Sequence, residues 1–129
     1  MILVDTSVWV GHLRAHDAAL ARLLEVTAVC AHPYIIGEIA LGQLRQRKLV
    51  LRALESLPRA LVATDHEVSR FTERHALYGR GIGYVDVCLL TAASLTANAR
   101  LWTNDRKLAA VAADLGLAAS PPFPPQSLG

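Results

Sequence analysis

Cysteine is scarce in this chain, and its few cysteines and histidines do not form a recognisable metal-binding pattern. Cys30 and Cys88 both lie in apolar runs without a CxxC partner, so we expect buried free thiols, as in proteins of a reducing compartment. His12 and His16 are four residues apart, a spacing that can bind zinc, but the sequence offers no third ligand. A disulfide framework and a zinc site are therefore both disfavoured.

Long hydrophobic runs are also missing. No apolar stretch approaches the roughly 20 residues that a membrane-spanning helix needs. The sequence starts with a strand-like segment and shows neither a basic leader nor a cleavage site. We therefore expect a cytoplasmic protein without a membrane segment.

What the chain has in excess is apolar side chains. It contains 129 residues, of which 53% are hydrophobic, and its mean hydropathy is +0.32. A chain of this length fits one domain, which cannot bury all of that apolar surface by itself. We expect some of it to contact a second copy or another protein. The proline-rich segment 120–129 is predicted to be a tail that follows a domain of residues 1–119.

Short apolar runs alternate with segments of helical periodicity. Strands are predicted at residues 2–5, 28–32, 60–63, 100–103 and 117–119, and helices at 6–13, 17–26, 33–45, 48–57, 65–78, 84–97 and 105–115. This alternation predicts a three-layer α/β domain, in which helices cover both faces of a parallel sheet of four to five strands. Ligands bind such sheets at the carboxyl ends of the strands.

Four carboxylates stand inside or at the end of apolar segments, where an unpaired charge is costly. They are Asp5, Glu38, Asp86 and Asp105. Each aspartate could instead cap a helix or complement its dipole. Glu38 lacks this explanation, because it is predicted to lie in the middle of a helix between apolar neighbours such as Tyr34 and Leu41.

A shared cation would explain all four positions. Two carboxylates about 4 Å apart repel by roughly 4 kcal/mol at an effective dielectric constant near 20, so a group of four would bind cations or protons. Ligands that are all oxygen select hard ions such as Mg²⁺ or Mn²⁺. These ions suit phosphoryl chemistry, in which they activate water and stabilise an in-line displacement.

Four sequence motifs carry a resemblance to a known family. They are Val4-Asp-Thr-Ser-Val-Trp, Ile36-Gly-Glu-Ile, Gly83-Tyr-Val-Asp-Val and Trp102-Thr-Asn-Asp-Arg-Lys-Leu. In this order they resemble the acidic motifs of PIN-domain ribonucleases, and most closely those of VapC toxins from VapBC toxin–antitoxin pairs. The resemblance runs from residue 1 to about residue 119.

The resemblance implies a function and roles for particular residues. Asp5, Glu38, Asp86 and Asp105 would be the catalytic and metal-binding residues, with Asp5 and Asp86 the surest Mg²⁺ ligands. Ser7 and Thr103 would support the site. The protein would be a Mg²⁺-dependent endoribonuclease that cuts structured tRNA or ribosomal RNA by metal-activated water. Its partners would be a VapB-like antitoxin and a second copy of the chain, in a homodimer and a larger complex with the antitoxin.

Basic side chains are candidates for RNA contacts. If the four carboxylates bind metal, the thirteen basic residues face only seven other acids, a balance that attracts a polyanion. Arg45 is predicted about 10 Å beyond Glu38 on the same helical face. The candidate residues are Arg45, Lys48, Arg52, Arg80, Arg106 and Lys107. The alternative for each is an ordinary solvated surface.

Other functions fit the sequence less well. A phosphoaspartyl phosphatase needs a second aspartate where Ser7 stands, and a receiver domain needs an acidic pair and a strand-end lysine that are not seen. Gly79, Gly81 and Gly83 follow a helix, so they lack the strand–loop–helix order of a nucleotide-binding loop. A binding module whose acidic pocket docks a partner's basic side chain stays open as the non-catalytic alternative.

Overall fold

Three parallel strands form the centre of the molecule. The structure is a computed structural model, and it describes residues 1–123. They are β1 (Ile2–Val4), β2 (Val29–Cys30) and β3 (Arg100–Trp102), in the order β2-β1-β3. Ile2 lies opposite Val29 and Arg100, and all three residues of β1 are buried. A continuous buried run of this kind is expected of a strand whose sheet is covered on both faces.

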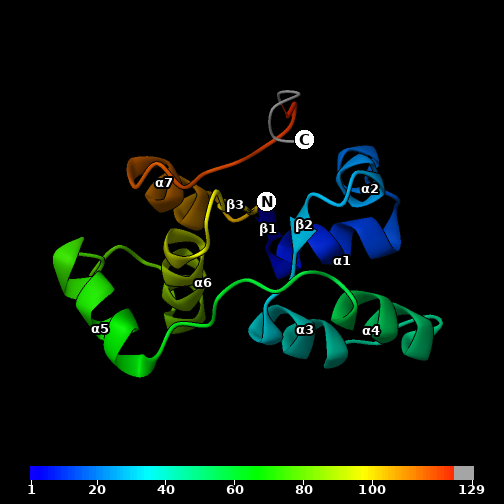
Figure 1. Ribbon diagram of the computed structural model, residues 1–129, viewed down its shortest axis with the longest axis horizontal. Helices are drawn as coiled ribbons and strands as arrows, with labels where there is room; N and C mark the ends of the chain where they lie inside the picture. Colours follow the sequence, from blue (N-terminus) through cyan, green and yellow to red (C-terminus); the bar gives the residue numbers. More distant parts are fainter. Residues whose placement is uncertain (124–129) are drawn as a thin grey trace.

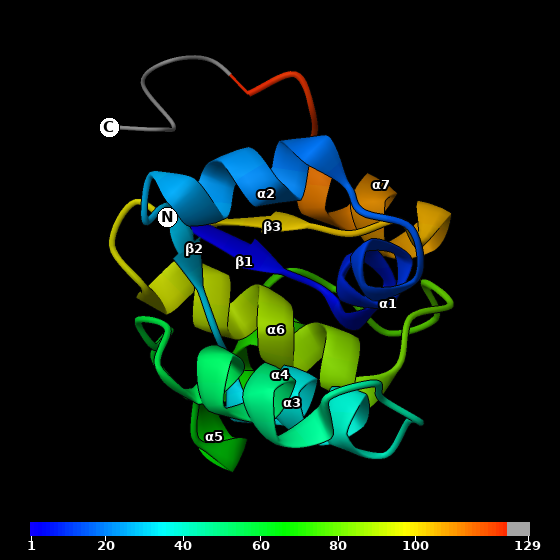
Figure 2. The ribbon, with the colours of Figure 1, turned by 90° about the vertical axis from the view of Figure 1, so that its right-hand side faces the viewer.

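Seven helices surround this sheet in the described part of the chain. They are α1 (Thr6–Arg14), α2 (Ala18–Glu25), α3 (Pro33–Ala40), α4 (Arg47–Glu55), α5 (Asp65–Arg74), α6 (Tyr84–Leu95) and α7 (Arg106–Asp114). Figures 1 and 2 show α2 and α7 on one side of the sheet and α6 on the other, with α3, α4 and α5 beyond α6 or beside it. The predicted three-layer α/β architecture is therefore confirmed.

The sheet has fewer strands than the four to five predicted. Residues 117–119 contribute a single parallel bridge, Ala118 with Leu101. The bridge at the other edge, Ala31 with Arg59, lies one residue before the predicted strand 60–63. Pairing stops after one residue at this edge because the next hydrogen bond to this segment would need an N–H at Pro33, the first residue of α3, which has none. The N–H of Leu61 points away from β2 and donates to Thr96 Oγ1 (2.9 Å). Leu61 and Val62 are exposed as a result.

Helix α3 ends five residues before the predicted boundary at residue 45. Arg47 explains the early end, because its guanidinium donates to the carbonyl oxygens of Ala40 (2.6 Å) and Gly42 (3.3 Å). A basic side chain that bonds the last carbonyls of a helix stabilises its C-terminus. The residues from Leu41 to Gln46 consequently form a turn that leads into α4.

The core contains the residues that its apolar pattern predicts. Trp9 and Trp102 are buried, and α6 is buried from Val87 to Ala93, which makes it the central helix of its layer. Cys30 and Cys88 are free and buried, as predicted. None of the helices among residues 1–123 is long and apolar enough to cross a membrane.

The C-terminal segment lies partly outside the described residues. Residues 124–129 of the predicted tail 120–129 are not described. Phe123 packs against Trp102, with ring centroids 5.2 Å apart. Phe123, which follows the predicted domain boundary at residue 119, thus still contacts the core. The boundary itself stays a prediction.

Candidate metal centre

Two of the four carboxylates follow neighbouring parallel strands. Asp5 comes directly after β1 and precedes α1, while Asp105 lies three residues after β3 and precedes α7. The N–H of Asp5 donates to the carbonyl oxygen of Trp102 (2.9 Å), which ties the two strand ends together. Both residues therefore lie at the carboxyl edge of the sheet, where ligands bind in folds of this class.

Asp5 is buried, with 8% of its surface exposed. Its Oδ2 atom accepts hydrogen bonds from Ser7 Oγ (2.9 Å) and Thr103 Oγ1 (2.7 Å). Its side chain makes no capping bond to α1, so helix capping does not explain this residue. No donor among residues 1–123 bonds its second oxygen, Oδ1.

Ser7 and Thr103 belong to a wider set of bonds around Asp5. Ser7 Oγ accepts the N–H of Asn104 (3.1 Å), and Thr103 Oγ1 accepts the N–H of Asp105 (3.1 Å). Each hydroxyl thus accepts a backbone N–H while it donates its own proton to Asp5. This arrangement fixes the direction of both donors, and with them the orientation of the carboxylate.

Asp86 lies in the first turn of α6 and is half-buried. Its Oδ2 atom accepts the N–H of Gly83 (3.0 Å). Burial raises the pKa of the Asp86 carboxyl, the N–H of Gly83 opposes the rise, and the negative charges of Asp5, Asp105 and Glu38 add to it. All three other carboxylates therefore lie within electrostatic range of Asp86.

Asp105 serves as an N-cap, one of the alternatives that its position allowed. Its Oδ1 atom accepts the N–H of Leu108 (2.9 Å), which satisfies a free donor in the first turn of α7. The residue is nevertheless exposed, and none of residues 1–123 donates a hydrogen bond to its Oδ2 atom. Capping therefore occupies one oxygen and leaves the other available for a ligand.

The prediction that Glu38 lies on an apolar face in the middle of a helix is wrong. Because α3 ends at Ala40, Glu38 lies in its last turn and is exposed, together with Tyr34 and Leu41. The carboxylate is held instead by Thr6, whose Oγ1 atom donates to Glu38 Oε1 (2.7 Å). Thr6 is a site residue that the sequence reasoning missed, although its position directly after Asp5 was a usable signal.

The four carboxylates share one hydrogen-bonding pattern. In each, a protein donor bonds one oxygen, and no donor from residues 1–123 bonds the other. Within these residues no three acidic, histidine or cysteine side chains come close enough to form a complete metal cluster. Like charges repel at short range, so carboxylates around one crevice stay apart unless a cation offsets the repulsion. An all-oxygen donor set of this kind fits a hard divalent cation.

The predicted basic residues are only partly brought to this site. Arg45 lies in the turn after α3, so it shares no helix with Lys48 and Arg52, but it lines the same groove as Glu38. Lys48 and Arg52 are exposed on α4, and Arg106 is exposed beside Asp105. The remaining two candidates have other contacts: Arg80 pairs with Asp114 (2.8 Å), and Lys107 packs along Gly81.

Comparisons with known proteins agree with this geometry. Residues 2–114 match the PIN domain family. Over 118 residues the sequence is 49% identical to Ribonuclease VapC32 of two strains of Mycobacterium tuberculosis, CDC 1551 / Oshkosh and ATCC 25618 / H37Rv. Each match covers 92% of this chain and 95% of the relative. The resemblance predicted from the four acidic motifs is thereby confirmed, and the chain belongs to the PIN-domain family.

Proposed function

We propose that this protein is a Mg²⁺-dependent endoribonuclease and the toxic component of a toxin–antitoxin pair, with Mn²⁺ as an alternative ion. One observation carries the proposal: each of the four carboxylates around one sheet edge keeps one oxygen to which no donor of residues 1–123 bonds. Its support from outside the structure is the similarity to proteins named as VapC ribonucleases. PIN-domain ribonucleases generally use a divalent metal.

Asp5, Glu38, Asp86 and Asp105 would hold the ion or ions. When bound, Mg²⁺ would supply positive charge that activates water and stabilises the displacement at a phosphodiester. The protein's own contribution is to orient the carboxylates before RNA arrives. Thr6 fixes Glu38, and the N–H groups of Gly83 and Leu108 fix Asp86 and Asp105.

Ser7 and Thr103 would act on Asp5 without touching the substrate. Their hydroxyls direct two hydrogen bonds at Oδ2, so the other oxygen of Asp5 is the one that the arrangement offers to a metal. These two residues are positioning residues in the proposed mechanism.

The proposed partners follow from the family and from the surface. VapC toxins pair with VapB antitoxins and act on RNA, and we propose a VapB-like antitoxin, a homodimer and a larger complex of the two for this chain. Leu41, Leu49 and Tyr84 are more than half exposed, which supports contacts with other protein chains. Structured tRNA or ribosomal RNA is the proposed substrate class. Free Cys30 and Cys88 support a reducing compartment such as the cytoplasm.

Mapping RNA ends in cells tests the proposal. Brief induction of the wild-type protein should generate new 5′ ends at discrete positions in RNA within minutes. Asp5→Asn, expressed to the same level, should generate none, because the variant lacks the central charge of the site. Identical new ends in both strains would contradict the proposal.

A further inference from the structure

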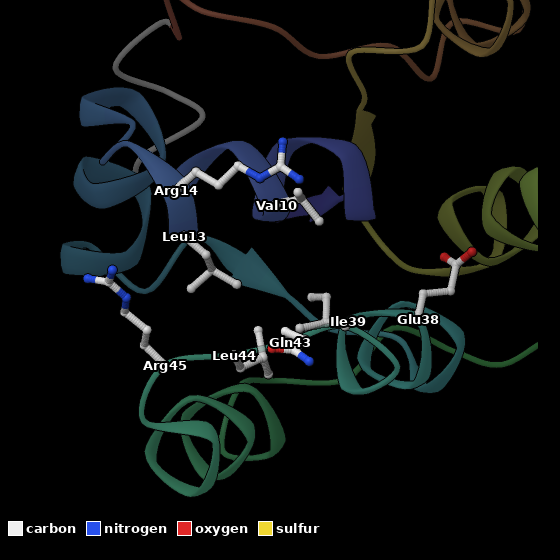
Figure 3. A pocket seen from close by; sticks show the side chains of 9 residues that line it. Val10, Leu13, Arg14, Glu38, Ile39, Gln43, Leu44 and Arg45 are labelled. Atoms are coloured by element: carbon white, nitrogen blue, oxygen red, sulfur yellow. The ribbon is translucent and has the colours of Figure 1, made fainter.

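A groove of about 580 Å³ leads away from Glu38 between α1 and the turn after α3. One wall consists of Val10, Leu13 and Arg14 on α1, and the other of Glu38, Ile39 and residues 42–45. Figure 3 shows the acidic end at Glu38 and the apolar side chains between it and Arg45. The groove therefore runs from Glu38, at the candidate metal centre, to Arg45 at its other end, with Arg14 along one wall.

Arg14 and Arg45 lie on opposite walls of this groove (Figure 3). Both are exposed, and neither guanidinium makes a hydrogen bond or an ion pair with any of residues 1–123. Several other arginines are engaged: Arg22 pairs with Glu25, Arg80 with Asp114, and Arg47 bonds backbone carbonyls. Two guanidiniums without a partner among residues 1–123 thus line one groove, Arg14 beside Val10 and Arg45 at the end away from Glu38 (Figure 3).

Arg47 contributes to the position of Arg45. Its bonds to the carbonyl oxygens of Ala40 and Gly42 hold the turn that carries Arg45 against the end of α3. Arg14, in turn, is the last residue of α1, the helix that begins next to Asp5. Both guanidiniums are therefore tied through short segments to the elements that carry Glu38 and Asp5.

We propose that Arg14 and Arg45 form a phosphate-binding subsite for the RNA strand that enters the metal centre. This inference rests on the proposed ribonuclease function. Guanidinium groups bind phosphate oxygens in a bidentate manner, and the intervening Leu13 and Leu44 offer apolar surface to sugars and bases. The charge gradient from Arg45 to Glu38 orients the strand, since phosphate is repelled at the acidic end except where a cation is bound.

Binding of a fluorescent, mixed-sequence single-stranded RNA oligonucleotide tests this subsite. The measurement is fluorescence anisotropy at several salt concentrations with Mg²⁺ present, in an Asp5→Asn background that leaves the RNA uncut. Arg14→Gln and Arg45→Gln should each weaken binding about three- to tenfold, the range for loss of one hydrogen bond of ordinary net strength. Each should also reduce the slope of log K against log salt by about 0.7, the contribution of one phosphate contact on a single strand.

A matched pair of arginines provides the control. Arg70 and Arg74 are exposed on α5 and line a different groove, which contains none of the four site carboxylates. Arg70→Gln combined with Arg74→Gln removes the same net charge and should change affinity and salt slope much less than the groove pair does. Equal losses in both double variants would overturn the proposal, because they would reflect net charge alone.

Two further outcomes separate this proposal from the one on which it rests. Unchanged RNA affinity in the Arg14→Gln, Arg45→Gln double variant overturns the subsite, even if the same substitutions weaken antitoxin binding. Wild-type protein, incubated with total cellular RNA and Mg²⁺, tests cleavage separately. Cleavage by the wild type together with unchanged binding by the double variant rejects the subsite alone, whereas a wild type that cuts no RNA rejects the proposed function.

Discussion

Asp5 and Asp105 occupy the same local position, the residue before a helix, yet their side chains have different roles. Asp105 caps α7 through Leu108, whereas Asp5 accepts its bonds from Ser7 and Thr103. The sequence predicts both positions but cannot distinguish them, because each aspartate precedes a helix and follows a buried strand closely. The difference depends on Thr103, which is close to Asp5 only in the folded sheet.

Substitutions at Asp105 should separate its two roles. Asparagine caps helices about as well as aspartate, so Asp105→Asn should leave the free energy of unfolding nearly unchanged, while Asp105→Ala should lower it by about 1 kcal/mol. Both should reduce RNA cleavage, because both remove the charge. Urea unfolding and cleavage rates measure the two effects. Equal stabilities for the two variants would argue against a capping role of Asp105. Full cleavage by Asp105→Asn would argue against its role in metal binding.

Thr6 should act through Glu38. Thr6→Val removes the donor to Glu38 Oε1 with little change in shape, so the exposed glutamate should lose its fixed orientation. We expect half-maximal cleavage to require several times more Mg²⁺, with a small effect on stability, because the lost bond is exposed. Thr6→Ser keeps the hydroxyl and is the matched control. If the valine and serine variants need the same Mg²⁺ concentration, Thr6 does not position Glu38.

Among the elements, α3 shows that the local sequence pattern predicts the start of a helix better than its end. Pro33 and the apolar spacing predict its start correctly. Its end depends on Arg47, seven residues beyond Ala40, whose bond to that carbonyl no periodicity reveals. The same limit applies to residues 60–63, because only the folded register places this segment beside Pro33, which has no N–H to continue the pairing. The face of α3 that carries Glu38 is exposed at Tyr34 as well, so Glu38 lies at the rim of the site and not on a buried face.

Helix α3 should also make the fold sensitive to acid. His32 is buried, and its Nδ1 atom accepts the N–H of Tyr34 as the N-cap, which requires a neutral ring. Burial lowers the pKa of His32, and the positive charge of Arg59 lowers it further. The unfolded chain therefore binds a proton more readily than the folded one. The stability that His32 contributes is complete above about pH 6.5, the unperturbed value, and is lost as the pH falls below it.

A comparison of His32→Asn with the wild type tests this sensitivity. Asparagine can still cap the helix but does not titrate in this range. The smaller side chain should lower stability at every pH, so the slope is the readout. Between pH 7 and pH 5 the wild type should lose more stability than the variant in urea unfolding. Parallel curves for the two proteins would contradict the role of His32.

For the whole molecule, the order of the four acidic motifs was enough to predict the family and its sheet-edge site. The carboxyl ends of parallel strands necessarily meet at one edge, which places Asp5 and Asp105 together without further information. Arg14 and the packing of Phe123 on Trp102 were not predicted, because both depend on segments that approach each other only in the tertiary structure. Long-range partners thus limited the sequence reasoning more than local propensity did.

Metal binding should stabilise the whole fold. An ion that binds only the folded state at ten times its dissociation constant adds about 1.4 kcal/mol, so Mg²⁺ should raise the melting temperature of the wild type. Asp86→Asn should abolish this increase. Without metal, the same variant should be at least as stable as the wild type, because it removes the charge whose ionisation burial and three neighbouring carboxylates disfavour. An equal increase with Mg²⁺ in both proteins would exclude Asp86 as a ligand.

The central claim is that these carboxylates hold the divalent ion that cuts RNA. The most direct test measures the cleavage of total cellular RNA by purified wild type, Asp5→Asn and Asp86→Asn, with Mg²⁺ or with EDTA, after circular dichroism confirms that all three are folded. We expect cleavage only by the wild type with Mg²⁺. Cleavage by the wild type in EDTA, or full Mg²⁺-dependent cleavage by either folded variant, would contradict the claim.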